Sequence, residues 1–172
     1  KNEKNRRSLV KEFSVIFMGT PGISKIYLQT LIEKKFNIIA VYTQPPRKKD
    51  RGLKIKKSSV HELAEKKNIA IYHPIHFNSK ETVNDLKKLN PSIVVVMGYG
   101  VIIPKNVLQI PKHGFINIHL SLLPRWRGAS PIEYAIINGD SKTGVSIFEL
   151  EEKLDSGPII DMKEICIEKN IT

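Results

Sequence analysis

The chain of 172 residues has a single cysteine, a single tryptophan and no long apolar run. One cysteine excludes an internal disulfide framework and a cysteine-rich zinc site, and this fits a reducing compartment. Cys166 lies in the alternating run 164–167, so we predict a buried strand residue rather than a nucleophile. No stretch approaches the roughly 20 apolar residues that span a bilayer, and residues 1–12 lack the apolar centre of a secretory signal. We therefore expect a soluble, intracellular protein.

Sequence motifs for phosphate and metal binding are missing as well. The segment Gly19-Thr20-Pro21-Gly22 stands where a dinucleotide-binding loop would follow the first strand, but the third glycine is absent and Pro21 has no amide hydrogen. We interpret this segment as a tight turn from strand to helix. No Gly-Lys-Ser/Thr sequence closes a phosphate loop, and the histidines show no metal-ligand spacing, so we predict no metal site.

Positive charge is in excess, because 28 lysines and arginines face 17 acidic residues and the formal net charge is +11. Such a field attracts phosphate groups, so a nucleic acid or a nucleotide suits this chain better than a basic partner. A generally lysine-rich composition is the alternative explanation. The basic residues concentrate between Pro45 and Ser58, where Asp50 is the only acid. They are Arg47, Lys48, Lys49, Arg51, Lys54, Lys56 and Lys57.

Apolar runs rich in β-branched residues alternate with segments of helical periodicity, which predicts an α/β fold. The run Ile93–Met97 is apolar on both faces, as a strand in a parallel sheet covered by helices must be. Ser58 is placed to cap one helix, and Asn78-Ser79-Lys80-Glu81 resembles a capping box that opens another. We predict a doubly wound, mostly parallel sheet flanked by helices, with ligands at the carboxyl ends of the strands.

We expect strands at Phe13–Gly19, Asn37–Thr43, Ala70–Tyr72, Ile93–Met97, Gly114–His119, Gly144–Leu150 and Ile159–Ile167. Helices are expected at Ile23–Lys34, at Ser59–Lys67, from the predicted capping box to Leu89, and at Pro131–Ile137.

The strand predicted to end at His119 carries two polar side chains on one face. The period of two places Asn117 and His119 together, while Ile116 and Ile118 point to the other face. Burying an amide and an imidazole without partners would cost a few kcal/mol, so both must be hydrogen-bonded or face a cleft. These residues alone fit either a satisfied core pair or a functional site.

The sequence after this strand carries a resemblance to a known family. Ser121-Leu122-Leu123-Pro124 follows, then a glycine, and later the loop Leu154-Asp155-Ser156-Gly157. An Asn-x-His strand, Ser-Leu-Leu-Pro, a glycine and Asp-x-Gly in this order resemble the formyltransferases that use 10-formyltetrahydrofolate. The resemblance implies the Rossmann-like formyltransferase fold for residues 13–172, as a catalytic domain, with residues 1–12 as a flexible basic extension.

The resemblance also implies roles for individual residues. Asn117 and His119 would donate hydrogen bonds to the formyl oxygen, and Asp155 would orient His119 and help to receive the amine proton. The folate pocket would be lined by Ser121, Leu122, Leu123, Pro124, Met97, Gly98 and Tyr99. For the two leucines an ordinary core position is the alternative.

Within the family, Pro124–Pro131 reads Pro-Arg-Trp-Arg-Gly-Ala-Ser-Pro and resembles the methionyl-tRNA formyltransferases. This implies initiator methionyl-tRNA as the formyl acceptor, with its acceptor stem against the basic segment 45–57 and against Arg125, Trp126 and Arg127. A solvated charged loop and a tryptophan packed on its neighbours are the alternatives. We expect a monomer that works in the bacterial cytoplasm or, in a eukaryote, in an organelle matrix.

Three features depart from the family pattern. Leu120 and Lys153 stand where these enzymes usually carry glycine, which could narrow the folate pocket or displace the Asp155 loop. The chain ends at Thr172, where methionyl-tRNA formyltransferases continue into a linker and a tRNA-binding barrel. Either the chain is a fragment or its acceptor differs. The alternatives are a formyltransferase for a small nucleotide-linked amine, such as glycinamide ribonucleotide or an amino-sugar nucleotide, and a non-catalytic RNA- or nucleotide-binding module.

Overall fold

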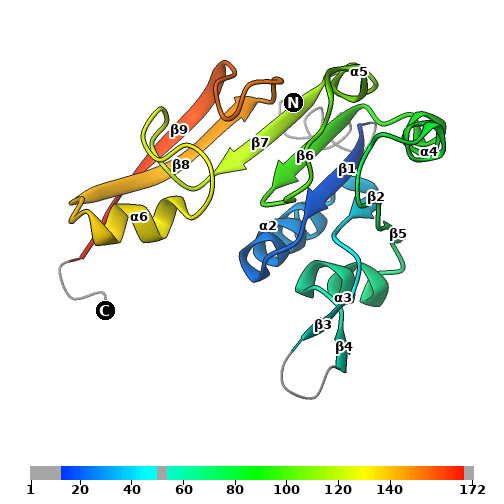
Figure 1. Ribbon diagram of the computed structural model, residues 1–172, viewed down its shortest axis with the longest axis horizontal. Helices are drawn as coiled ribbons and strands as arrows, with labels where there is room; N and C mark the ends of the chain where they lie inside the picture. The colour runs from blue at the N-terminus through cyan, green and yellow to red at the C-terminus, as the bar shows by residue number, and fades with distance from the viewer. Residues whose placement is uncertain (1–12, 50–53, 169–172) are drawn as a thin grey trace, which may run out of the picture. The chain divides into compact units, whose positions relative to one another are not determined.

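The computed structural model describes residues 13–49 and 54–168. The predicted extension 1–12 and Arg51 therefore lie outside the described residues. The chain divides into two compact units, residues 1–114 and 115–172. Figure 1 follows the described elements from β1 in blue to β9 in red.

The first unit is built on a parallel sheet. Strand β1 pairs with β2 and β6, and β2 pairs with β5, which gives the strand order β5-β2-β1-β6. Every side chain from Val15 to Met18 is at most 2% exposed, so both faces of β1 are covered as predicted. The strands are β1 (Ser14–Gly19), β2 (Asn37–Tyr42), β5 (Ala70–Tyr72) and β6 (Ile93–Met97).

The helices of this unit connect strands on the two sides of β1. Helices α2 and α3 lead from β1 to β2 and on to β5, and α4 returns from β5 to β6 on the other side of β1. Because such crossovers are right-handed, α4 covers the sheet face opposite to α2 and α3. The doubly wound fold class is confirmed, and ligands of such sheets bind where the order reverses, at the carboxyl ends of β1 and β6. The helices are α2 (Gly22–Glu33), α3 (Ser59–Lys66), α4 (Lys80–Leu89) and the short α5 (Lys105–Leu108).

Serine side chains cap two of these helices. Ser58 Oγ accepts a hydrogen bond from the His61 amide at 3.0 Å, as predicted. Ser79 Oγ accepts one from the Thr82 amide at 3.1 Å. The predicted capping box is wrong by one residue, because Ser79 rather than Asn78 is the cap and Thr82 occupies the third helical position.

The basic segment forms a hairpin that the sequence did not predict. Strand β3 (Arg47–Lys49) pairs with β4 (Lys54–Lys56) in antiparallel fashion, with Arg47 opposite Lys56. Like charges on opposite positions disfavour such pairing, so side-chain pattern gave no signal for a strand. Backbone hydrogen bonds form this hairpin despite the charges.

The second unit is an antiparallel sheet with one helix. Strand β7 pairs with β8, and β8 pairs with β9. The prediction that Cys166 is buried is wrong: it lies on β9, whose residues are all exposed, and β9 pairs with β8 alone among the described strands. Alternation predicts a strand but not whether anything covers it. The elements are β7 (Phe115–His119), α6 (Pro131–Ile137), β8 (Lys142–Glu149) and β9 (Ile159–Cys166).

The turn from β1 to α2 provides a test of the fold. A Cβ at Gly19 would lie 2.8 to 2.9 Å from the Phe17 ring, the Met97 carbonyl and Ser24, whereas a Cβ at Gly22 would meet nothing within 4 Å. We expect Gly19→Ala to lower the free energy of unfolding by about 1 to 3 kcal/mol, as overpacking does. Gly22→Ala should be neutral or stabilise by up to about 1 kcal/mol. Urea unfolding of both variants checks this, and equal effects would contradict it.

Candidate active site

Strand β7 presents the two polar residues that the sequence singled out. His119 is 7% exposed, and the residues paired with Asn117 and His119 on β8, Phe148 and Ser146, are fully buried. Asn117 Oδ1 is buried and has no hydrogen-bond partner among the described residues. An unpaired polar atom of this kind costs about 1 to 3 kcal/mol, so it calls for a functional explanation. The structure thus leaves Asn117 Oδ1 without a partner in the described part of the chain.

The imidazole of His119 is held from both sides. Its Nε2 lies 2.7 Å from the Trp126 carbonyl oxygen. Because a carbonyl oxygen only accepts, Nε2 carries the hydrogen and donates it. Nδ1 lies 3.8 Å from Asp155 Oδ2. This distance is too long for a hydrogen bond but short enough for an electrostatic interaction. The structure therefore brings His119 and Asp155 together and turns Nδ1 toward the carboxylate.

Asp155 is fixed by the same turn that holds the histidine. Its side chain is buried, and Oδ2 accepts a hydrogen bond from the Gly128 amide at 2.7 Å. The loop behind it passes so close to β8 that a Cβ at Gly157 would collide with the Glu149 carbonyl. The Asp-x-Gly spacing therefore has a physical reason, since only glycine allows this approach.

The Ser-Leu-Leu-Pro segment is mostly engaged in the turn itself. Ser121 Oγ donates to the Arg125 carbonyl at 2.6 Å, and the buried Ser146 hydroxyl donates to the Ser121 carbonyl at 2.7 Å. Leu123 is buried, and its amide donates to Ser146 Oγ at 3.1 Å. Leu122 packs where a Cβ on Gly144 would stand. Pro124 is exposed. The two leucines thus occupy packed positions in this unit.

Of the predicted tRNA contacts after Pro124, which are Arg125, Trp126 and Arg127, the first two are bound within the protein. Arg125 donates to both carboxylate oxygens of Asp140, at 2.8 and 2.6 Å, and Trp126 Nε1 donates to Asp140 Oδ2 at 2.7 Å. The Trp126 ring stacks on Tyr134 with centroids 5.6 Å apart. The structure therefore shows the packed tryptophan that the sequence left as an alternative. Arg127 is exposed.

The hydrogen bonds from Arg125, and then that from Trp126, lower the pKa of Asp140 to about 2. Asp140 was not predicted, because it follows a helix end and has no spacing relation to the motifs.

The predicted pocket residues of the first unit lie at the reversal of strand order. The Met97 carbonyl accepts a hydrogen bond from Ser24 Oγ at 2.7 Å, and the Tyr99 carbonyl accepts from Thr20 Oγ1 at 3.1 Å and Gln44 Nε2 at 3.3 Å. Met97 and Tyr99 are buried, and burial raises the pKa of the Tyr99 phenol. The Tyr99 hydroxyl has no partner among the described residues. Thr20 and Gln44 hold this loop in place through these hydrogen bonds. The sequence analysis did not predict that role for either residue.

The two glycine departures are accommodated by the backbone. Gly98 has φ +57°, in the left-handed region, but Leu120 and Lys153 are not among the residues with positive φ. Neither position therefore needs the left-handed backbone that favours glycine.

Two histidines stack at the start of α3. The rings of His61 and His73 lie 4.9 Å apart, and His61 Nδ1 has no partner among the described residues. Burial, followed by the charges of His73 and Lys57, lowers the pKa of His61, and Glu65 and Glu62 act in the opposite direction. Residues 13–49 and 54–168 hold no cluster of three or more potential metal ligands, so this pair stands alone.

The basic hairpin presents Arg47, Lys56 and Lys57 to solvent. Lys57 is paired with Glu65 at 2.8 Å, so its charge is partly balanced. Among the described side chains of this segment, Arg47 and Lys56 are exposed and have no recorded ion pair.

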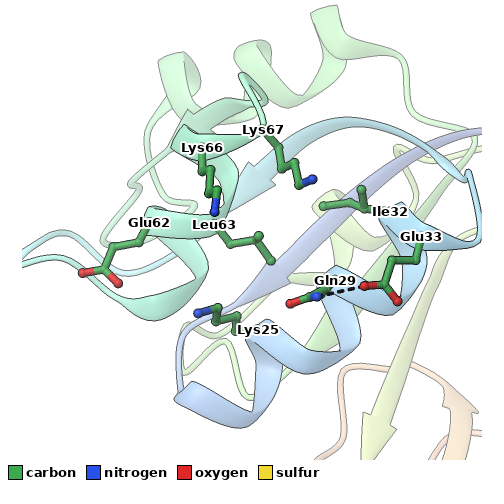
Figure 2. A pocket seen from close by; sticks show the side chains of 8 residues that line it. All are labelled: Lys25, Gln29, Ile32, Glu33, Glu62, Leu63, Lys66 and Lys67. Carbon is green, nitrogen blue, oxygen red and sulfur yellow. Dashed lines mark hydrogen bonds between the residues drawn. The ribbon is translucent and has the colours of Figure 1, made fainter.

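A hollow of about 370 Å³ lies between α2 and α3 (Figure 2). Its charges are mixed, because Lys25, Lys66 and Lys67 share it with Glu33 and Glu62. None of the predicted site residues line it, so we do not assign it to the candidate site.

Comparison with known proteins identifies the family. The family model for formyl transferases matches residues 11–172. The chain is 46% identical over 158 residues to the methionyl-tRNA formyltransferase of Clostridioides difficile (strain 630), covering 92% of this chain and 51% of that protein. It is 47% identical over 156 residues to that of Wolbachia sp. subsp. Drosophila simulans (strain wRi), covering 91% and 52%. The chain belongs to the formyl transferase family, and it spans about half the length of the curated relatives it matches.

Solved structures agree with the Rossmann-like formyltransferase fold. Phosphoribosylglycinamide formyltransferase from Bacillus halodurans is similar with a TM-score of 0.73 and 26% identity, covering 92% of this chain and 82% of that one. The enzyme of the same name from Anaplasma phagocytophilum gives a TM-score of 0.76 at 21% identity, covering 94% and 76%. In the described part of the chain, no helix has the length and apolar character needed to cross a membrane.

The stacked histidines predict a loss of stability in acid. Because the pKa of His61 is lowered in the folded protein, the unfolded chain takes up this proton first. Stability is therefore full above the unfolded pKa of about 6.5 and falls as the pH drops through it. We expect His61→Gln to reduce the difference in Tm between about pH 7.5 and about pH 5.5, while the exposed His76→Gln leaves it unchanged. Calorimetry at both pH values checks this, and an unaltered difference in His61→Gln would argue against it.

Proposed function

We propose that this chain is the catalytic part of a methionyl-tRNA formyltransferase, which transfers a formyl group from 10-formyltetrahydrofolate to the amino group of initiator methionyl-tRNA. The relatives at 46 and 47% identity carry this name. The observation that carries the proposal is the arrangement of Asp155 at 3.8 Å from His119 Nδ1, with Asn117, whose Oδ1 has no partner among the described residues, on the same strand face as the histidine. We further propose a monomer of the bacterial cytoplasm or of an organelle matrix.

The reaction makes three demands on a protein. The amine nitrogen bonds to the formyl carbon, the bond from that carbon to the folate nitrogen breaks, and the folate nitrogen finally takes up the proton that the amine loses. Negative charge grows on the formyl oxygen, and a proton must leave the amine. The site therefore needs a hydrogen-bond donor for the oxygen, a proton acceptor near the nitrogen and a group that stabilises the charge which the acceptor gains.

The geometry supports one role for each residue. Asn117 supplies the donor for the oxygen through Nδ2, because the amide nitrogen donates whereas Oδ1 only accepts. His119 takes the amine proton at Nδ1, because Nε2 already donates to the Trp126 carbonyl. Asp155 lies 3.8 Å away and stabilises the positive charge of the ring. This revises the role that the resemblance implied for His119, from donor toward the formyl oxygen to proton acceptor.

The residues present fit a folate-derived formyl donor. We propose that the Met97–Tyr99 loop and the Ser121–Pro124 turn hold it, as the resemblance implied. The Tyr99 hydroxyl, buried and without a partner among the described residues, supports this for the Met97–Tyr99 loop, because a hydrogen-bonding heterocycle would satisfy it. The donor supplies the formyl group, and the chain binds it and moves the proton.

The proposal predicts large losses of turnover from single substitutions. Removal of one oxyanion donor usually lowers turnover by about 100- to 1,000-fold. We expect this for Asn117→Ala and for Asp155→Asn, while Asp161→Asn, an exposed carboxylate on β9, keeps normal activity. Formylation of methionyl-tRNA with 10-formyltetrahydrofolate measures the effect, and circular dichroism confirms the fold. Losses below about tenfold in both site variants would contradict the mechanism.

The acceptor is tested in the same assay with glycinamide ribonucleotide and an amino-sugar nucleotide in place of the tRNA. Faster turnover of either small amine would overturn the assignment of methionyl-tRNA while keeping the formyl chemistry. Binding of tRNA or nucleotide without any transfer would favour the non-catalytic module.

The basic hairpin provides a separate prediction for tRNA. If Arg47 and Lys56 contact phosphates, each alanine substitution should lower the slope of log affinity against log salt by about one. Lys142→Ala is the matched control, because Lys142 lies on β8 and is paired with Glu164 at 2.7 Å. Fluorescence anisotropy with labelled initiator tRNA at several salt concentrations gives these slopes. Equal slopes in all variants would remove the hairpin from the interface.

A further inference from the structure

The turn after Ser-Leu-Leu-Pro is held through its backbone by the residues of the candidate site. Ser121 Oγ donates to the Arg125 carbonyl, and His119 Nε2 donates to the Trp126 carbonyl. The Gly128 amide donates to Asp155 Oδ2. The positions of the imidazole and of the carboxylate therefore depend on where this short stretch of backbone lies.

The backbone of the turn is not a conformation that its sequence favours. Trp126 has φ +57° and Gly128 has φ +88°, both in the left-handed region. Glycine adopts this region freely, but a bulky residue such as tryptophan does so only when its surroundings impose it. Some other contact must therefore hold Trp126 in place.

Asp140 provides that contact from outside the site. Its two carboxylate oxygens accept three hydrogen bonds, from Arg125 Nε at 2.8 Å, Arg125 Nη2 at 2.6 Å and Trp126 Nε1 at 2.7 Å. The Asp140 side chain is 14% exposed, and the Arg125 guanidinium lies 4.4 Å from the centroid of the Trp126 ring. Asp140 is itself anchored, because its amide donates to the Ala135 carbonyl of α6 at 2.9 Å.

We propose that Asp140 is a positioning residue of the active site, which fixes the Arg125–Gly128 turn so that the Trp126 carbonyl holds His119 and the Gly128 amide holds Asp155. Asp140 has no recorded contact with His119 or Asp155, and it acts through the backbone between them. This inference rests on the proposed function, since the residues that Asp140 positions are those assigned to the proton transfer. Its carboxylate remains charged throughout the pH range of an assay, because the hydrogen bonds of Arg125 and Trp126 lower the pKa of Asp140.

The consequence for chemistry lies in the tautomer of His119. With the Trp126 carbonyl in place, the hydrogen stays on Nε2 and the lone pair of the neutral ring stays on Nδ1, toward Asp155. If the turn relaxes, the ring loses its only recorded hydrogen bond and can adopt the other tautomer or rotate. Nδ1 would then no longer be presented as a proton acceptor.

The test uses Asp140→Asn, which keeps the volume but removes the charge that holds both oxygens on Arg125 and Trp126. We expect kcat for formyl transfer to fall by about 10- to 100-fold, the usual effect of losing a group that orients a reacting residue, with KM little changed. The ¹⁵N spectrum of the His119 ring should show loss of the Nε2-protonated form. Glu164→Gln is the control, because it breaks an exposed ion pair with Lys142 in the same unit without touching the turn.

Trp126→Phe is the second variant, in case Asp140→Asn does not fold. It removes the hydrogen bond from Nε1 and leaves the pair of Arg125 with Asp140 intact, so we expect the same spectral change and a smaller loss of kcat. The spectrum is recorded without substrate, so it tests the positioning role even if the wild-type chain formylates a different amine or none. An unchanged His119 spectrum in the folded variants would overturn the proposal, whatever their melting temperatures.

Discussion

The hydrogen bond from His119 Nε2 to the Trp126 carbonyl governs what the second unit can do chemically. It decides which ring nitrogen carries hydrogen, and it turns the other nitrogen toward Asp155 at 3.8 Å. The Gly128 amide, two residues further on, holds that carboxylate. Because one piece of backbone positions both groups, their separation does not depend on how two independent loops pack. At 3.8 Å the two groups make no direct hydrogen bond, so both remain available to a third molecule.

This constraint also explains why glycine stands at two positions that have no side chain to take part in the chemistry. Gly157 must be glycine because the Asp155 loop passes against the Glu149 carbonyl. Gly128 takes φ +88°, which lets its amide point at the carboxylate instead of continuing the chain direction. Gly128 and Gly157 therefore both serve the geometry of the carboxylate.

The fold was predictable where burial alone determines it. Val15–Met18 and Ile93–Met97 are apolar on both faces, and only a covered parallel sheet hides such strands. Side-chain type singled out the amide, imidazole and carboxylate in the sequence, and the structure brings the imidazole of His119 and the carboxylate of Asp155 to within 3.8 Å. Contacts made by backbone atoms could not be predicted, because the Trp126 carbonyl has the same chemistry as every other carbonyl in the chain. The role of Asp140 was not predicted for a related reason. An acidic residue after a helix end matches no sequence motif, and its role is visible only once the turn that it binds is known.

Buried polar groups in this chain differ in whether they have a hydrogen-bond partner. Ser24 and Ser146 are completely buried. The hydroxyl of each donates a hydrogen bond to a backbone carbonyl and so fixes a strand or a turn. Asn117 Oδ1 and the Tyr99 hydroxyl are equally shielded, yet neither has a partner among the described residues. Each such atom costs about 1 to 3 kcal/mol that an apolar residue of similar shape would avoid. Their retention is understandable if a bound substrate supplies the missing hydrogen bonds. These atoms then destabilise the free protein but are already in place to stabilise the complex.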